Sequence, residues 1–118
     1  MSLGVRYDDL RGRRALVAGG SSGIGLGIAE AFLEQGMKVA IHHRSHRAEA
    51  EALAARFPGQ GFAVGADLST EVGCVGLVRD AARALGGIDQ LVHSAGIWND
   101  GPIATLGAAR LEEIFRLD

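Results

Sequence analysis

Short, largely apolar segments alternate with longer amphipathic or alanine-rich segments along most of the sequence. The short segments are typical of buried strands; they comprise residues 14–18, 39–41, 62–64 and 88–93. The longer segments predict helices over residues 24–35, 47–57 and 69–85. Strands and helices that alternate at this interval imply right-handed crossovers and a parallel sheet with helices on both faces. The sequence therefore predicts an α/β fold without internal repeats or linkers.

Residues that favour helix ends separate these segments. Gly36 is predicted to stop the first helix, and Ser69 is predicted to cap the third, with Glu71 near its positive end. The apolar face predicted for the first helix comprises Ile24, Ile28, Ala31 and Phe32. The apolar positions predicted for the third helix are Val72, Val75, Leu77, Val78, Ala81, Ala82 and Leu85.

Size and composition narrow the classes of partner. A chain of 118 residues with 47% hydrophobic residues is the size of one domain with its own core. The formal net charge of -2 gives no basic field for nucleic acid or an anionic membrane, so neither is expected as a partner. Cys74 is the only cysteine, which excludes an internal disulfide and fits a reducing cytoplasm. The uncharged stretch 15–29 is too short and too rich in glycine and serine to predict a membrane span or a targeting segment.

A glycine-rich turn connects the first predicted strand to the first predicted helix. Gly19, Gly23 and Gly25 lack a Cβ, which lets backbone N–H groups approach an anion closely. The helix N-terminus adds the positive end of a dipole, and a pyrophosphate can span the turn and the first helical turn together. Because no Gly-Lys-Ser/Thr sequence follows, the spacing differs from that of a P-loop.

Three segments resemble the short-chain dehydrogenase/reductase family. Residues 18–25 (AGGSSGIG) are similar to its TGxxxGIG cofactor motif, with Ala18 in place of the usual Thr. Asp67 follows the third strand, where the family has an Asp placed against the adenine ring. Residues 88–96 (IDQLVHSAG) resemble the family's fourth strand, with His93 and Ser94 in place of two Asn residues. The resemblance follows the family's order across residues 14–96.

The resemblance implies an oxidoreductase that transfers a hydride between NADP(H) and a small-molecule carbonyl or alcohol substrate. It implies a single NAD(P)-binding domain over residues 1–118, with the first four strands and intervening helices of a Rossmann-type doubly wound parallel sheet, incomplete at the C-terminus. The residues that it places around the cofactor are Gly19, Ser21, Ser22, Gly23, Ile24, Gly25, His43, Arg44, Ser45, Asp67, Leu68, Ser94, Ala95 and Gly96.

The end of the second strand favours NADP over NAD. NAD-preferring Rossmann domains carry an acidic residue about 20 positions after the glycine motif, whereas the 2′-phosphate of NADP prefers Arg. Here His43 takes the acidic position and Arg44 follows it, with Ser45 and Arg47 as further donors and no carboxylate expected to compete. His42 and His43 point to opposite sides of a strand, so no metal site is predicted.

The family's catalytic Tyr-x-x-x-Lys pair is not found. Tyr7 is the only tyrosine and Lys38 the only lysine, so we predict no catalytic residue and expect the 118-residue chain to be inactive alone. A helical apolar face over residues 111–117 ends at Asp118 without a stop signal, which suggests a truncated chain. A non-catalytic NADP-binding or regulatory module and an inactive truncated remnant are the alternatives.

The resemblance also predicts an open sheet edge. Without further strands, the outer edge of the fourth strand would remain unpaired, which predicts self-association or a homo-oligomer. Trp98 is expected in the loop after Gly96, where an isolated Trp more often packs than binds.

Overall fold

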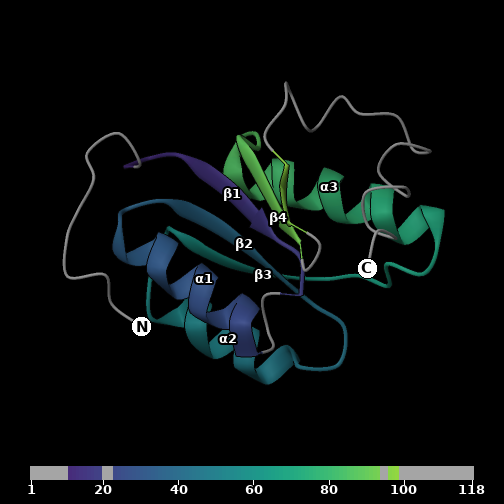
Figure 1. Ribbon diagram of the computed structural model, residues 1–118, viewed down its shortest axis with the longest axis horizontal. Helices are drawn as coiled ribbons and strands as arrows, with labels where there is room; N and C mark the ends of the chain where they lie inside the picture. The colour runs from purple at the N-terminus through teal and green to yellow at the C-terminus, as the bar shows by residue number, and fades with distance from the viewer. Residues whose placement is uncertain (1–10, 20–22, 94–95, 99–118) are drawn as a thin grey trace.

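The computed structural model describes residues 11–19, 23–93 and 96–98 (Figure 1). Its elements in chain order are β1 (Arg14–Val17), α1 (Gly23–Glu34), β2 (Lys38–His43), α2 (Arg47–Ala55), β3 (Gly61–Gly65), α3 (Glu71–Leu85), β4 (Gln90–His93) and β5 (Gly96–Trp98). In this part of the chain the strands form one sheet in the order β3-β2-β1-β4-β5. The four strands β1 to β4 pair in parallel, which confirms the predicted Rossmann-type α/β fold.

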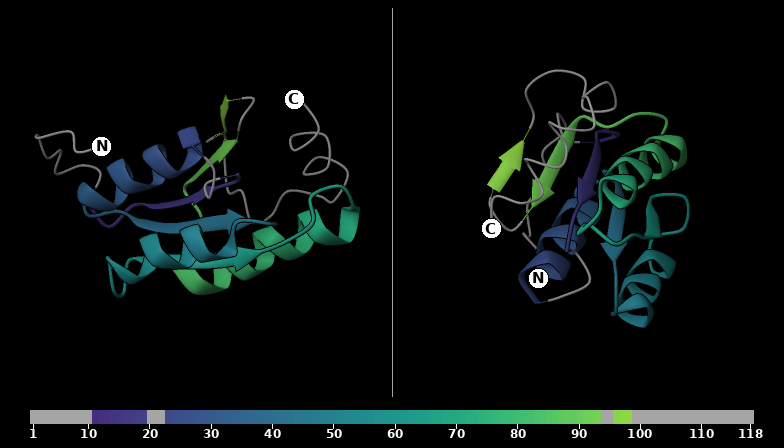
Figure 2. Two further views of the ribbon diagram at one scale, coloured as in Figure 1. Left: turned by 90° about the horizontal axis from the view of Figure 1, so that it is seen from below. Right: turned by 90° about the vertical axis from the view of Figure 1, so that its right-hand side faces the viewer.

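Two apolar clusters lie on opposite faces of the sheet because side chains alternate along each strand. Leu16 and Ala40 belong to the cluster beneath α3, whereas Val17 and Ile41 belong to the cluster beneath α1 and α2. Figure 2 shows α1 and α3 on the two sides of the sheet. All four of these side chains are almost completely buried, so the short apolar segments of the sequence form the core.

The first helix buries only part of the predicted face: Ile28 and Phe32 pack against the core, whereas Ile24 does not. Ala29 and Leu33 are its buried residues, while Ile24 is 85% exposed. The expectation that Ile24 belongs to the core-facing stripe is therefore wrong. Ile24 lies in the first turn of α1, where the helix opens onto a cavity instead of covering the sheet. The predicted stop at Gly36 is confirmed, since its φ of 85° lies in the left-handed region.

The third helix starts one residue later than predicted. Thr70, not Ser69, is its N-cap, and the Thr70 hydroxyl accepts a 2.9 Å hydrogen bond from the Gly73 N–H. The Ser69 hydroxyl instead donates to Asp67 Oδ1 at 2.6 Å. Val72, predicted to be apolar core, is 83% exposed because it lies on the side of α3 opposite the buried residues, such as Cys74 and Leu77.

The outer edge of β4 is paired, contrary to the prediction of an open edge. β5 runs antiparallel to β4, with Leu91 opposite Trp98 and His93 opposite Gly96. Trp98 therefore lies in a strand and not in a loop. Apolar periodicity could not predict this pairing, since three residues are too few to show a strand pattern. The helix predicted over residues 111–117 lies outside the described residues.

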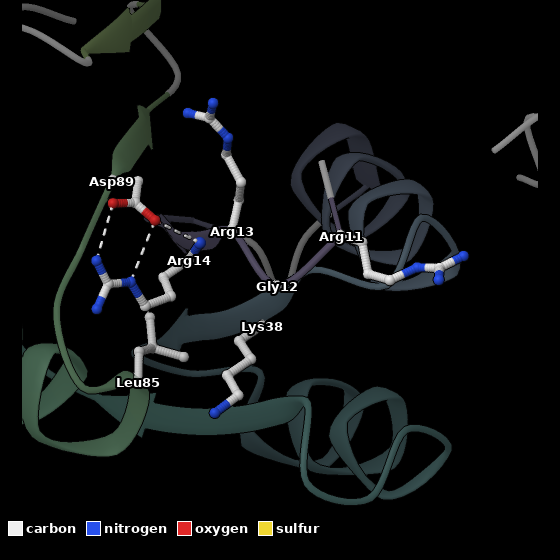
Figure 3. Close-up of a pocket in the computed structure, with 7 residues that line it drawn as sticks. All are labelled: Arg11, Gly12, Arg13, Arg14, Lys38, Leu85 and Asp89. Carbon is white, nitrogen blue, oxygen red and sulfur yellow. Dashed lines mark hydrogen bonds and ion pairs between the residues drawn. The ribbon is translucent and has the colours of Figure 1, made fainter. Parts of the chain in front are cut away.

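A charged pair links β1 to the segment before β4 (Figure 3). It lies where the parallel strands begin, which is called the amino edge of the sheet, and the opposite end, where they finish, is called the carboxyl edge. The Arg14 guanidinium donates to both carboxylate oxygens of Asp89, at 3.1 and 3.0 Å, and to the Gly86 carbonyl at 2.7 Å. The Arg14 backbone N–H also donates to Asp89 Oδ2 at 2.9 Å. These hydrogen bonds lower the pKa of Asp89 and raise that of Arg14, so both stay charged and the register of β1 and β4 is fixed.

Candidate functional site

A cavity of about 480 Å³ opens at the carboxyl ends of β1 and β4. Ligands of open α/β sheets bind outside the carboxyl ends of the strands. The residues that line this cavity are Val17, Ala18, Gly19, Gly23, Ile24, Gly25, Ile28, Val92 and His93. Four of the residues predicted from the glycine motif are thus gathered at one cavity, and the exposed Ile24 is one of its walls.

The backbone at the glycine turn is open to a ligand. Gly19 has a φ of 76°, a conformation that residues with a Cβ adopt only with strain. A Cβ at Gly19 or at Gly23 would meet no atom of the described residues within 4 Å, and both glycines line the cavity. Because α1 starts at Gly23, the positive end of its dipole points into the same region. The two described ends of the turn, Gly19 and Gly23, thus border a cavity at a helix N-terminus, a position that favours an anion.

His42 is a residue of this site that sequence reasoning missed. It is 6% exposed at the end of β2. Its Nδ1 accepts a 2.9 Å hydrogen bond from the Gly19 N–H, and its Nε2 lies 2.9 Å from the Ala66 carbonyl oxygen. Burial is the largest cause of the lowered pKa of His42. The strand pattern indicated only that His42 and His43 face opposite sides, and it gave no sign that His42 reaches another turn.

His43 presents a polar atom that the protein does not satisfy. Its Nδ1 is the only buried side-chain nitrogen or oxygen among the described residues that lacks a hydrogen-bond partner. The ring packs against Gly65, its partner residue on β3, where an added Cβ would come within 2.9 Å of His43 Cε1. A buried, unsatisfied polar group costs free energy, so a group that forms a hydrogen bond with His43 Nδ1 would stabilise this region.

Arg44 is paired with a carboxylate, contrary to the expectation that none competes there. Arg44 Nη2 lies 3.7 Å from Asp67 Oδ2, and both side chains are exposed. The parallel pairing of β2 with β3 places the residues after each strand at the same edge, which their separation in the sequence concealed. Two hydrogen bonds from Ser69 are the main cause of the lowered pKa of Asp67, and Arg44 adds a smaller contribution.

The other predicted site residues either make contacts within the protein or lie outside the described residues. Ser45 lies next to His46, with 3.3 Å between Ser45 Oγ and His46 Nδ1. The Leu68 carbonyl accepts a hydrogen bond from the buried Cys74 thiol at 3.3 Å. Gly96 begins β5. The predicted contacts at Ser21, Ser22, Ser94 and Ala95 lie outside the described residues. The cavity at the carboxyl ends of β1 and β4 is not lined by His43, Arg44 or Asp67.

A second cavity lies at the opposite, amino edge of the sheet (Figure 3). Its lining includes four cationic residues, Arg11, Arg13, Arg14 and Lys38. In Figure 3 their charged groups point in different directions, and Arg14 is directed at Asp89. Cations that diverge do not form a site for one anion, so this cavity offers no comparable binding geometry.

The described residues contain neither a cluster of metal-ligating side chains nor a membrane-spanning helix. No group of three or more His, Cys, Asp or Glu side chains in residues 11–19, 23–93 and 96–98 is arranged to hold a metal ion. Within the same ranges, no helix has the length and apolar character required to cross a membrane.

Most of the chain matches a known protein family. The model described as short chain dehydrogenase matches residues 13–118. A D-beta-hydroxybutyrate dehydrogenase of Cupriavidus necator is 37% identical over 112 residues, which cover 92% of this chain and 43% of that protein. The chain belongs to the short chain dehydrogenase family, a family of oxidoreductases with an NAD(P)-binding fold. It spans less than half the length of this relative.

Solved structures agree with this assignment. A short chain dehydrogenase from Burkholderia cenocepacia in complex with NADP has a TM-score of 0.68 and 36% identity, covering 87% of this chain and 43% of that one. A 3-ketoacyl-(acyl-carrier-protein) reductase from Brucella melitensis complexed with NADH has a TM-score of 0.64 and 38% identity, covering 70% and 34%. The similarity thus includes proteins solved with either nicotinamide dinucleotide.

Proposed function

We propose that this chain supplies the NADP(H) site of an oxidoreductase that acts on a small-molecule carbonyl or alcohol. The observation that carries the proposal is the glycine turn, whose open backbone and helix N-terminus border the cavity at the carboxyl edge of the sheet. A bound nicotinamide dinucleotide would supply the hydride, and the protein would bind and orient it.

The described residues fit a dinucleotide at two separate points. Gly23 and the first turn of α1 present N–H groups to a pyrophosphate, while the Gly19 N–H is donated to His42 and fixes the turn beside them. At the end of β2, the unsatisfied Nδ1 of His43 needs a hydrogen-bond partner, and a ribose hydroxyl is a group that provides one. His43 stands where NAD-preferring domains have a carboxylate.

Arg44 supports a preference for NADP. A guanidinium forms strong, charge-assisted hydrogen bonds with a phosphate, and the 2′-phosphate is the group that distinguishes NADP from NAD. The competing carboxylate of Asp67 is 3.7 Å away and largely exposed, so its hold on Arg44 is weak. A dianionic phosphate is therefore expected to take over the guanidinium.

Nucleotide titration tests the preference. We expect the chain to bind NADPH about tenfold more tightly than NADH, equivalent to about 1.4 kcal/mol, as followed by nicotinamide fluorescence. Arg44→Leu is expected to remove that difference with little change in NADH affinity. Arg79→Leu is a matched control, since Arg79 is exposed on α3 and paired only with its neighbour Asp80 among the described contacts. Equal or tighter binding of NADH by the unmodified chain would refute the preference.

The same cuvette tests whether the chain catalyses a reaction. We propose that it binds NADPH without oxidising it, because Tyr7 and Lys38 cannot form the Tyr-x-x-x-Lys pair of the family. A constant absorbance of NADPH after addition of simple ketones or diketones is the expected result. Turnover would show that another residue of this chain supplies the acid.

A further inference from the structure

We infer that His42 is a positioning residue for the glycine turn, holding the Gly19 N–H through Nδ1 while Nε2 holds the turn after β3. The inference rests on the proposed function only in that this turn receives the dinucleotide. His42 connects the ends of β1 and β3 across β2, which lies between them in the sheet. It lies outside the cavity lining, so its role is to shape the binding backbone.

The two hydrogen bonds determine the tautomer of the ring. Nδ1 faces an N–H donor and must therefore carry no proton, which places the proton of the neutral ring on Nε2. Nε2–H then donates to the Ala66 carbonyl. In this tautomer both ring nitrogens are satisfied, whereas a protonated ring would turn a donor toward the Gly19 N–H.

The surroundings of His42 favour the neutral ring. Burial is the largest cause of its lowered pKa, opposed by the hydrogen bond to Ala66, and His43 and His93 lower the pKa further by charge repulsion. Asp67 follows the carbonyl that accepts from Nε2. Helix α3 packs against β2, and its first turn adds Glu71 and Cys74 as titratable groups.

The sign of the pH effect follows from this pKa. The unfolded ring takes up a proton as the pH falls through its ordinary pKa of 6.5, before the folded ring does. The two hydrogen bonds of His42, to Gly19 and to Ala66, form a clamp between the two turns. This clamp is intact above pH 6.5, and its contribution to the free energy of unfolding declines on acidification below that value. Nucleotide affinity is expected to fall when the folded ring is protonated in turn.

Two substitutions of His42 by amide residues test its two hydrogen bonds one at a time. In His42→Asn the side-chain oxygen takes the place of Nδ1 and can still accept from Gly19. In His42→Gln the amide nitrogen takes the place of Nε2 and can still donate to Ala66, while the acceptor for Gly19 is lost. Neither amide titrates, so both variants remove the pH dependence caused by protonation of the His42 ring. The pH dependence caused by protonation of the nucleotide phosphate remains in both.

The experiment measures amide hydrogen exchange at Gly19 without ligand, and the dissociation constants of NADP⁺ from pH 8 to pH 5 by calorimetry. We expect His42→Asn to stay within about threefold of the unmodified chain in both measurements at pH 7. For His42→Gln we expect exchange and dissociation constant to rise about tenfold, the effect of losing one buried hydrogen bond. The part of the pH dependence that the ring causes should be absent from both variants.

Several results would overturn the inference. One is unchanged Gly19 exchange in His42→Gln; another is equal weakening of binding in both variants, in proportion to their loss of stability against urea. Should the variants fail to fold, nitrogen NMR of the unmodified chain still decides, since a ring protonated on Nδ1 at pH 7 refutes the clamp. If the unmodified chain binds no nucleotide, the proposed function fails, while the tautomer and the exchange rate still test the hydrogen bonds.

Discussion

The two edges of the sheet use polar groups in opposite ways. At the amino edge Arg14, Asp89 and the Gly86 carbonyl satisfy one another, and the result is a fixed register between β1 and β4. At the carboxyl edge, His43 keeps a buried nitrogen without a partner among the described residues, and Gly19 and Gly23 border a cavity. Closed networks stabilise a fold, whereas a buried unsatisfied group and an unfilled cavity at the same edge are two separate features that a ligand would complete.

The carboxyl edge is nevertheless built on a rigid base. His42 braces the glycine turn, and two hydrogen bonds from Ser69 hold Asp67. Both side chains form contacts within the protein, so the ligand-facing backbone is fixed before a ligand arrives. Such preorganisation lowers the free-energy cost of binding.

Crowding at Gly73 should break the carboxyl edge most severely. A Cβ at Gly73 would overlap the carbonyl oxygen of Asp67, so Gly73→Ala must separate α3 from the turn after β3. We expect a loss of about 2–3 kcal/mol in the free energy of unfolding, the usual cost of overpacking, measured by urea denaturation. Gly76→Ala is the control in the same helix, where the added Cβ meets only Arg79 Nη2 at 3.7 Å. It should gain about 0.5–1 kcal/mol from helix propensity.

Equal effects of the two alanines, or no loss in Gly73→Ala, would show that the turn carrying Asp67 adapts freely. The description of a rigid base at the carboxyl edge would then be wrong.

Removing the charge of Asp89 should loosen the amino edge by a smaller amount. Asp89→Asn weakens the hydrogen bonds from Arg14, and because both side chains are about one-third exposed we expect a loss of about 1 kcal/mol at pH 7. Asp80→Asn on α3 serves as the control, since its pair with Arg79 is exposed and local. Nucleotide affinity should be unchanged in Asp89→Asn, because the two edges act separately.

Acid should remove this difference. The lowered pKa of Asp89 means that its contribution is fully present above the ordinary value of 3.8 and is lost as the pH falls through the lowered pKa. The unfolding curves of Asp89→Asn and the unmodified chain should therefore converge on acidification below pH 3.8. Curves that remain equally separated in acid would contradict a charge-based link.

The smallest effect is expected from the carboxylate that competes for Arg44. Asp67→Asn keeps an oxygen to accept from Ser69 but removes the charge 3.7 Å from Arg44. NADPH should bind about two- to threefold more tightly at low ionic strength, with the gain disappearing in high salt because exposed charges are screened. NADH titrations provide the comparison, since a change shared by both nucleotides would come from the position against the adenine ring that the resemblance gives Asp67. Weaker NADPH binding would mean that the carboxylate itself contacts the nucleotide.

The sequence predicted the sheet well because its signals are local. Buried strands such as residues 39–41 and the stop at Gly36 depend on hydrophobicity and backbone freedom, which neighbouring residues encode. The helix N-termini were less well predicted: Ile24 and Val72 are exposed because each lies on the side of its helix opposite the buried residues. Apolar character alone does not show which residues of the first turn face the sheet.

The candidate site was predicted only as far as its motif extends. The glycine residues at the cavity are confirmed as neighbours because they lie close together in the sequence. The clamp from His42 to Gly19 and the pair of Arg44 with Asp67 join residues 23 positions apart in each case. Such contacts depend on strand order and register, which no single segment of the sequence contains.

The most direct test of the account is a map of backbone amide chemical shifts of the chain with and without NADPH. We predict shifts at Gly19, Gly23 and Arg44, all at the carboxyl edge, and none at Arg14 or Asp89 at the amino edge. Shifts concentrated around Arg14 and Asp89, or no shifts at saturating NADPH, would contradict the assignment of the cofactor site to the carboxyl edge.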